Sequence, residues 1–171
     1  MLISQAMNDA INEQIGNEFG ASLQYVAVAA YFDRESLPVL AQHFYAQATE
    51  ERDHAMRFVK YVVDAGGTVM IPAIPAPRSG LKSAEEAVQL SLDSELKVTR
   101  QINALIDRAL KENDHIAGHM LQWFATEQLE EVSSMETLLR MIQRAGDSGL
   151  LFVESYLSQN PRAASAEGDA A

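Results

Sequence analysis

Apolar residues recur at intervals of three and four along four long stretches of the chain, the spacing of one face of an α-helix. The stretches cover about residues 4–32, 37–65, 84–112 and 115–145. A shorter apolar segment follows at about residues 150–157, after the glycine-containing break at 146–149. The pattern therefore predicts an all-α protein with four long helices and a short fifth helix at the C-terminal end.

Residues that favour helix ends stand between these stretches. Ser36 is expected to cap the second helix, with Pro38 in its first turn, where a missing N–H costs little. Ser83 and Glu86 have the spacing of a capping box for the third helix. The pair at 113–114, Asn followed by Asp, predicts the end of the third helix and the start of the fourth.

The connections between the predicted helices decide how they are arranged. Residues 66–81 contain three prolines, so this segment cannot be helical and is expected to be extended. Its 16 residues can reach roughly 50 Å, and a helix of about 28 residues is about 42 Å long. The other long helices are joined by short turns, so those pairs are antiparallel. The sequence thus predicts an up-down-down-up four-helix bundle with one long crossover between the second and third helices.

We expect residues 1–158 to form a single domain and residues 159–171, a tail of small and acidic residues, to be disordered. The net charge of -11 disfavours binding to nucleic acid or to anionic membranes. The absence of cysteine excludes disulfides, thiolate zinc sites and iron–sulfur clusters. The chain begins without a basic segment followed by an apolar run, and we expect a soluble cytoplasmic protein.

Each long helix also carries glutamate where its apolar stripe predicts a core residue. One such glutamate usually lies at the edge of the stripe with its carboxylate in water. Four helices interrupted near mid-length are different, because several unpaired carboxylates in one core would be very costly. A multivalent cation removes that cost, whereas protonation of all of them would require large pKa shifts. The interrupting residues are Glu18, Glu51, Glu95 and, on a fourth-helix stripe that includes Met120 and Trp123, Glu127 with Glu130 or Glu131.

The kinds of side chain in this set indicate which metals they suit. Glu51 and His54 are three residues apart on one helix face, an arrangement that di-iron helical bundles use to bind one ion. The whole set is rich in oxygen, contains one imidazole and lacks thiolate. This composition favours iron or manganese over copper, and zinc could compete for part of it.

At these positions the sequence resembles the bacterial non-haem ferritins, from about Ile3 to Leu157. The resemblance implies a ferritin-like fold with a di-iron centre in each subunit. The segments that carry it are Asn17-Glu18-Phe19 with Tyr25, Glu50 to Ala55, Glu95, and Trp123 to Glu131.

The family resemblance also implies particular ligands. One iron would be held by Glu18, Glu51 and His54, and the second by Glu51, Glu95 and Glu131, so that Glu51 bridges them. Gln128 and Tyr25 would lie beside the centre, although Tyr25 could equally be an ordinary core aromatic. A third site would use Glu50, Glu127, Glu130 and Glu131.

Two departures from related families refine this expectation. Bacterioferritins carry a haem-binding methionine two residues before the helix histidine, and here that position is Arg52, so haem is not expected. Bacterioferritins and many di-iron oxidases repeat Glu-x-x-His on the fourth helix, whereas this chain has Glu127-x-x-Glu130. The second iron would then lack an imidazole and be bound more weakly, which favours turnover of iron over a permanent cofactor.

The resemblance implies a ferroxidase that oxidises Fe(II) with O2 or H2O2. It also implies a homo-oligomeric shell, with 24 subunits expected, that stores ferric oxyhydroxide mineral. Two alternatives stay open. One is a soluble di-iron oxidase or rubrerythrin-like peroxidase on the same bundle. The other is a non-catalytic helical scaffold whose buried acids form hydrogen-bond networks.

Overall fold

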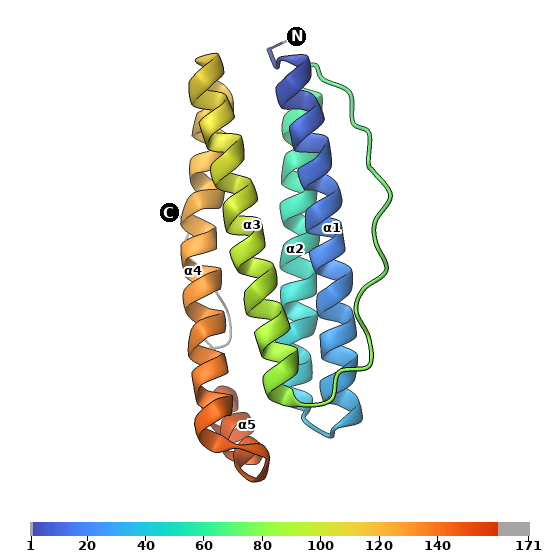
Figure 1. The fold of residues 1–171 in the computed structure, drawn as a ribbon, viewed down its shortest axis with the longest axis vertical. Helices are drawn as coiled ribbons and strands as arrows, with labels where there is room; N and C mark the ends of the chain where they lie inside the picture. Colours follow the sequence, from blue (N-terminus) through green and yellow to red (C-terminus); the bar gives the residue numbers. More distant parts are fainter. Residues whose placement is uncertain (1, 161–171) are drawn as a thin grey trace.

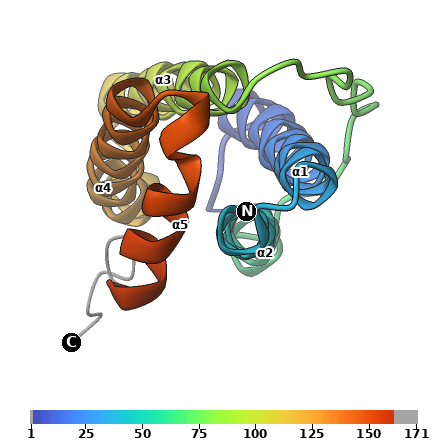
Figure 2. The same ribbon diagram turned by 90° about the horizontal axis from the view of Figure 1, so that it is seen from below.

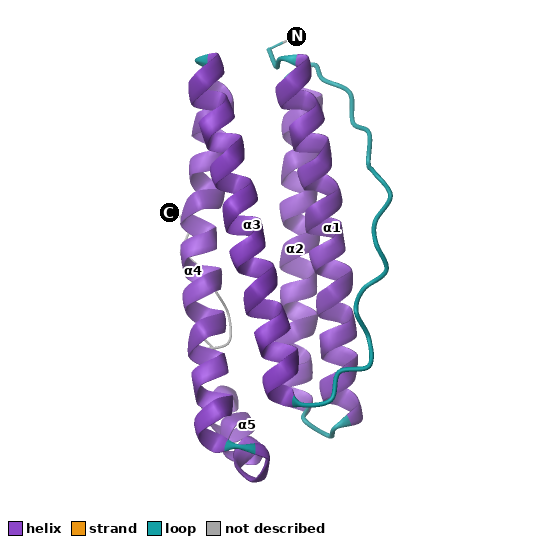
Figure 3. Ribbon diagram, in the orientation of Figure 1, coloured by secondary structure: helices purple, strands orange, loops and turns teal. Residues whose placement is uncertain are grey.

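The computed structural model describes residues 2–160, and Figures 1 and 3 show that this part of the chain is helical, without strands. The predicted all-α fold is therefore confirmed. The expected disordered tail falls almost entirely on residues outside the described range. The elements are α1 (Gln5–Arg34), α2 (Pro38–Asp64), α3 (Ala84–Glu112), α4 (His115–Ala145), a 3₁₀ turn at Asp147–Gly149, and α5 (Leu150–Gln159).

The helices form the predicted bundle with one crossover. Helices α1 and α2 run antiparallel, as do α3 and α4, whereas α2 and α3 run in the same direction (Figure 1). The extended segment 65–83 makes this possible by returning along the outside of the bundle (Figure 1). Viewed along the bundle, α5 lies across one end, where it contacts α2 and α4 (Figure 2).

Side-chain amides of α1 hold the crossover in place. Asn8 donates to the Thr68 carbonyl and accepts from the Thr68 amide, at 3.2 and 3.0 Å. Asn12 also donates to the Thr68 carbonyl, at 2.8 Å, and accepts from the Met70 amide, at 2.9 Å. Further along, an added Cβ at Gly16 would lie 2.4 Å from the Pro72 side chain. The close approach of the crossover to α1 therefore depends on the missing side chain at Gly16.

Most of the predicted helix ends are confirmed, although one carboxylate of the predicted capping box accepts a hydrogen bond from a different amide than expected. Ser83 accepts a hydrogen bond from the Glu86 amide at 3.0 Å, as in a capping box. The Glu86 carboxylate, however, accepts from the Lys82 amide at 2.8 Å. Asn113 ends α3 in the left-handed conformation, and Asp114 caps α4 by accepting from the Ala117 amide. Helix α5 extends two residues beyond its predicted end, and one beyond the expected domain boundary at 158.

The predicted cap at Ser36 is wrong. Ser36 has a φ of +60° and belongs to the tight turn that closes α1, so the N-cap of α2 is Leu37, whose side chain makes no capping bond. The first amides of α2 are satisfied from elsewhere in the chain. The buried Glu154 of α5 accepts from the Val39 amide at 3.0 Å and from the Leu40 amide at 2.7 Å.

The interior contains two apolar clusters, one towards each end of the bundle. The cluster near α5 includes Tyr25, Phe44 and Met135, and the other includes Ile15 and Phe58. Between them, each of the four long helices is interrupted by polar side chains. None of the helices in the described part of the chain is long and apolar enough to cross a membrane.

Candidate metal centre

Four glutamates fill the polar layer between the apolar clusters, one from each long helix. The exposed fractions of Glu18, Glu51, Glu95 and Glu131 are 0%, 1%, 0% and 1%. Their helical spacing explains this burial, because each stands one turn from a core residue on the same face. The sequence pattern identified Glu18, Glu51 and Glu95 and left Glu130 or Glu131 open on the fourth helix, where the fold buries Glu131.

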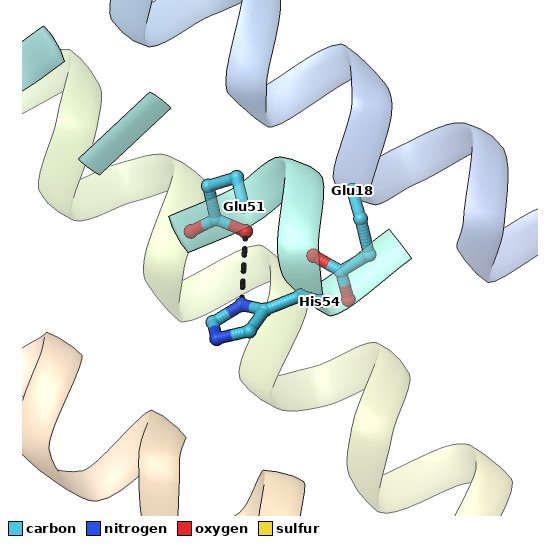
Figure 4. Close-up of side chains that lie close together, drawn as sticks. All are labelled: Glu18, Glu51 and His54. Atoms are coloured by element: carbon cyan, nitrogen blue, oxygen red, sulfur yellow. Dashed lines mark hydrogen bonds and ion pairs between the residues drawn. The ribbon is translucent and has the colours of Figure 1, made fainter. Parts of the chain in front are cut away.

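Glu18, Glu51 and His54 form the tightest group in this layer. One ligand atom from each lies within 4.8 Å of the others, and within residues 2–160 no other group of three His, Asp or Glu side chains does so. Figure 4 shows the three side chains converging from α1 and α2. His54 Nδ1 lies 3.3 Å from Glu51 Oε2.

Glu95 is held by two neighbours that are also buried. Tyr25 donates its hydroxyl hydrogen to Glu95 Oε1. Gln128 Nε2 lies 3.1 Å from Glu95 Oε2 and 3.2 Å from both the Glu95 carbonyl oxygen and Thr99 Oγ1. Tyr25 and Gln128 therefore contact a core carboxylate directly, and this contact fixes both oxygens of Glu95.

Other carboxylate oxygens in the layer have no such partner. Within the described residues, Glu18 Oε2 and both oxygens of Glu131 are buried without a hydrogen bond. Buried polar atoms in folded proteins are nearly always satisfied, and each exception needs an explanation. Three unsatisfied carboxylate oxygens in one layer leave donor atoms free to coordinate a cation.

Burial raises the pKa of every carboxyl group in the layer, and repulsion between carboxylates adds to the effect at Glu18, Glu51 and Glu131. Loss of solvation raises the pKa of Glu18 to about 7. At Glu131, loss of solvation together with repulsion from nearby carboxylates, which are Glu95, Glu50 and Glu127, raises the pKa to about 9. Burial, then repulsion from Glu95, Glu18 and Glu131, raises the pKa of Glu51 well above its usual range. Without a cation, the layer therefore retains protons that a bound metal ion would displace.

The pKa values of His54 and Tyr25 are also shifted, and each shift keeps the neutral form of the side chain. Burial, reinforced by the nearby Arg57, lowers the pKa of His54 to about 4, so that its imidazole is neutral near pH 7. The neutral imidazole is the form that binds metal ions. Burial and the adjacent carboxylates raise the pKa of Tyr25 well above its usual value, which keeps its phenol protonated and able to donate.

The remaining acids of the expected third site lie at the edge of the layer. Glu50, Glu127 and Glu130 are half-buried, and Gln47 donates a hydrogen bond to Glu50. Glu131 belongs to the core layer and is the only member of that set that is fully buried. Arg52, at the position where bacterioferritins carry methionine, is exposed and pairs with Asp53 at 3.4 Å.

The predicted core face of α4 is displaced by one residue. Met120, Trp123 and Glu127 are half-buried, and the buried positions are instead the next residues along the helix. Adjacent residues on α4 are often both apolar, so the periodicity fits two neighbouring faces almost equally well. The observed core face carries Leu121, Phe124, Gln128, Glu131 and Met135.

Two further residues near the layer were missed by the sequence pattern. Gln14 is buried on α1 and donates to Glu18 Oε1 at 2.8 Å. Its position four residues before Glu18 was the available signal. The Arg57 guanidinium lies 3.7 Å from the centre of the Trp123 ring, which in turn packs edge-to-face against His54 at 5.5 Å.

The fold and this layer define a class of protein: a four-helix bundle that encloses a carboxylate-rich layer with a histidine, able to hold a metal ion. The family of ferritin-like domains matches residues 8–145, and the chain belongs to the ferritin family. Membership of this family supports a general function in iron storage.

Individual relatives cover nearly the whole chain. Ferritin BfrB of Mycolicibacterium smegmatis is 45% identical over 157 residues, which are 92% of this chain and 86% of the relative. The bacterial non-heme ferritin of Staphylococcus aureus is 36% identical over 146 residues, or 85% and 88% of the two chains. Among solved structures, an open pore ferritin from Archaeoglobus fulgidus superposes with a TM-score of 0.88 at 32% identity, covering 92% of this chain and 97% of that one.

Proposed function

We propose that this protein stores iron by oxidising Fe(II) with O2 inside each subunit and depositing the ferric product as mineral within a shell of identical subunits. The observation that carries the proposal is the set of four buried glutamates, two of which have unsatisfied oxygens, beside a neutral imidazole. Such a set is unfavourable in an apolar core unless a cation joins it. Oxygen ligands with one imidazole suit Fe(II) as the substrate.

In this proposal the four helices supply two neighbouring positions for iron. Glu18, Glu51 and His54 hold one Fe(II), and Glu51, Glu95 and Glu131 hold the other. Glu51 repels all three other core glutamates electrostatically, which supports its role as the shared ligand. Holding two ions side by side turns a reaction that needs several collisions into one within a fixed assembly.

The overall chemistry is a two-electron reduction of O2. Each Fe(II) gives up one electron, and O2 takes both electrons and two protons to leave as H2O2. The Fe(III) ions then hydrolyse to ferric oxyhydroxide and release protons to water. Tyr25 and Gln128 orient Glu95 through their hydrogen bonds, and the apolar clusters on either side keep bulk water from the layer.

Glu50, Glu127 and Glu130, together with Glu131, are proposed as a further site that iron passes on its way out of the subunit. Their partial exposure supports this role, because an ion there can exchange with solvent more easily than one in the core. Haem is not part of the proposal, because the exposed guanidinium of Arg52 stands where a thioether ligand would be required.

The unsatisfied oxygens also distinguish this proposal from the scaffold alternative. A scaffold that used buried acids for hydrogen bonding would be expected to satisfy them, since a half-satisfied polar network is less stable than an apolar core. Neither oxygen of Glu131 accepts a well-formed hydrogen bond among the described residues, and Gln47, the nearby amide, donates to Glu50 instead. A purely structural role leaves that carboxylate unexplained.

The test mixes metal-free protein with Fe(II) in air in a stopped-flow instrument. The initial rate at which the absorbance of ferric species rises is the quantity compared. The double variant Glu18→Gln, Glu51→Gln keeps side-chain size but removes two anionic ligands, and we expect its initial rate to fall at least about 100-fold, the scale of losing positioned metal ligands. Glu13→Gln, an exposed site on α1, serves as the matched control and should oxidise iron at the wild-type rate. Equal rates for the double variant and the control would overturn the assignment.

A further inference from the structure

Gln14 is a buried amide that stands one helical turn before Glu18. Only 2% of its surface is exposed, and its Nε2 donates to Glu18 Oε1 at 2.8 Å. At the other end of the amide, Asn17 Nδ2 lies 3.5 Å from Gln14 Oε1 and offers it a hydrogen. The donor on Asn17 thus favours the amide orientation that turns the NH2 group towards Glu18.

Two exposed pairs in the same protein show what is particular about Gln14. Gln5 donates to Asp9 at 2.7 Å on α1, and Gln89 donates to Asp93 at 2.9 Å on α3, both with the same spacing of four residues. On the surface such pairs contribute little, because each partner can bond to water instead. In the core Glu18 has no exposed surface, so Gln14 decides which of its oxygens is occupied.

The two oxygens of Glu18 consequently differ. Oε1 accepts the Gln14 hydrogen bond, whereas Oε2 is buried and accepts from no amide, hydroxyl or backbone N–H within residues 2–160. The protonated Glu51 carboxyl is the other group placed to hydrogen-bond to Glu18, and a bound cation would replace its proton. Glu18 is also one of the three residues whose ligand atoms converge with those of Glu51 and His54. Each carboxylate oxygen can accept about two bonds, so the Glu18 oxygen without a hydrogen bond has more capacity for a cation than Oε1, which already accepts from Gln14.

We propose that Gln14 is a positioning residue that makes Glu18 a ligand through one oxygen, Oε2, by occupying Oε1. This inference rests on the proposed function, because it requires Glu18 to bind the metal ion. A carboxylate bound through one oxygen takes one coordination position on the ion, whereas binding through both takes two. Gln14 would thereby keep one position on the first ion open for another ligand, such as the reacting oxygen species.

The experiment uses Co(II) alone as a spectroscopic probe on the metal-free, assembled protein. Gln14→Met replaces the amide with an unbranched apolar side chain of similar length, which preserves packing and removes the donor. We expect the dissociation constant for Co(II) at the first site to rise about 10- to 100-fold, the usual effect of losing a hydrogen bond to a metal ligand. At saturating Co(II), the visible absorption should also weaken, because Glu18 can then bind through both oxygens and raise the coordination number.

The absorption at saturation separates positioning from mere stability. A residue that only supported folding would lower the melting temperature and leave the spectrum of the saturated protein unchanged. Gln5→Met is the matched control, since it removes the exposed amide–carboxylate pair on the same helix. This control should match wild type in both affinity and spectrum.

The outcomes distinguish the two proposals. If wild type and Gln5→Met bind Co(II), and Gln14→Met matches them in affinity and spectrum, the role of Gln14 is overturned while the metal centre stands. Wild-type protein that binds no Co(II) in the bundle would overturn both. If Gln14→Met does not fold, anomalous diffraction from a wild-type crystal soaked in Co(II) decides the question. One Glu18 oxygen on the ion supports the role of Gln14, and two oxygens refute it.

Discussion

At the scale of single residues, the core glutamates differ in how many of their oxygens are satisfied. Glu95 has both oxygens hydrogen-bonded, Glu18 has one, and Glu131 has none among the described residues. Hydrogen bonds to a carboxylate stabilise its charged form, so this order affects which acid retains a proton when no metal is present. At Glu131, burial and then repulsion from Glu95, Glu50 and Glu127 outweigh the lowering effect of the nearby Gln47 and raise the pKa to about 9.

This difference predicts how the stability of the metal-free protein depends on pH. The folded state binds the Glu131 proton more tightly than the unfolded state does, where the pKa is near 4.5. The stabilising contribution is complete below about pH 4.5 and is lost as the pH rises towards about 9. Glu131→Gln resembles the protonated form, and its melting temperature should match that of wild type near pH 5.

At pH 8 the same variant should melt at least about 2–4 °C above wild type, the shift that roughly 1 kcal/mol produces in a domain of this size. The measurement is calorimetry of chelator-treated protein at both pH values. Saturating Co(II) should remove or reverse the difference, because the variant lacks a ligand. The exposed Glu13→Gln should show no pH-dependent difference from wild type. A Glu131→Gln variant less stable than wild type at pH 8 without metal would contradict this account.

At the scale of helices, α2 depends on α5 for the hydrogen bonds of its first turn. Glu154 accepts from two backbone amides of α2, and the N-terminal end of a helix favours a negative charge. Because Glu154 is buried, water cannot easily replace it there. One carboxylate thus both caps α2 and anchors α5 across the end of the bundle.

Glu154→Ala should therefore destabilise the protein by about 1–3 kcal/mol, the cost of leaving buried donors without a partner. Denaturant unfolding measures the loss. Hydrogen exchange provides the local test, since the amides of Val39 and Leu40 and those of α5 should exchange faster. Ser158→Ala, an exposed change on the same helix, should leave all of these unchanged. Unaltered protection at Val39 and Leu40 would show that the carboxylate does not cap α2.

Helix patterns also show where prediction from sequence succeeds and fails. Apolar periodicity, the long proline-containing connection and the glutamates at mid-helix were sufficient for the bundle, its crossover and the core acids of α1, α2 and α3. These patterns could not select the core face of α4. Trp123 and Phe124 are adjacent and both apolar, so the spacing alone does not show which of them is buried, and in the fold it is Phe124. The cap at Ser36 failed for a different reason. Glu154, which accepts hydrogen bonds from the first amides of α2, is at least 114 residues away in the sequence, so a local pattern cannot predict this contact.

The residues of the candidate site also divide into those that the sequence predicts and those that only the fold reveals. Glu18, Glu51 and Glu95 interrupt clear apolar stripes, so the sequence marks them. Gln14 was missed because a neutral amide next to a stripe has the appearance of an ordinary surface residue, and its role depends on burial that only the fold provides. Glu131 was one of two choices on α4 until the helix orientation placed it in the core.

At the scale of the whole molecule, one subunit exposes apolar side chains that a monomer would not be expected to keep in water. Helix α5 buries Val153 and Leu157 against the bundle, yet Leu151 and Phe152 are 71% and 80% exposed. Contiguous exposed apolar surface usually marks an interface. We therefore expect α5 to contact other subunits at this face in the proposed shell.

The mass of the particle tests this expectation directly. Twenty-four copies of the 18.8 kDa chain would give a particle of about 450 kDa by size-exclusion chromatography with light scattering. The double variant Leu151→Glu, Phe152→Glu places two charges in the proposed interface, where burying unpaired charge is costly, so smaller species should accumulate as the protein is diluted. Gln159→Glu adds a charge at the polar end of the same helix and should remain assembled. A wild-type mass of only a few subunits would favour a soluble di-iron oxidase on this bundle over storage, because a small oligomer encloses no space for mineral.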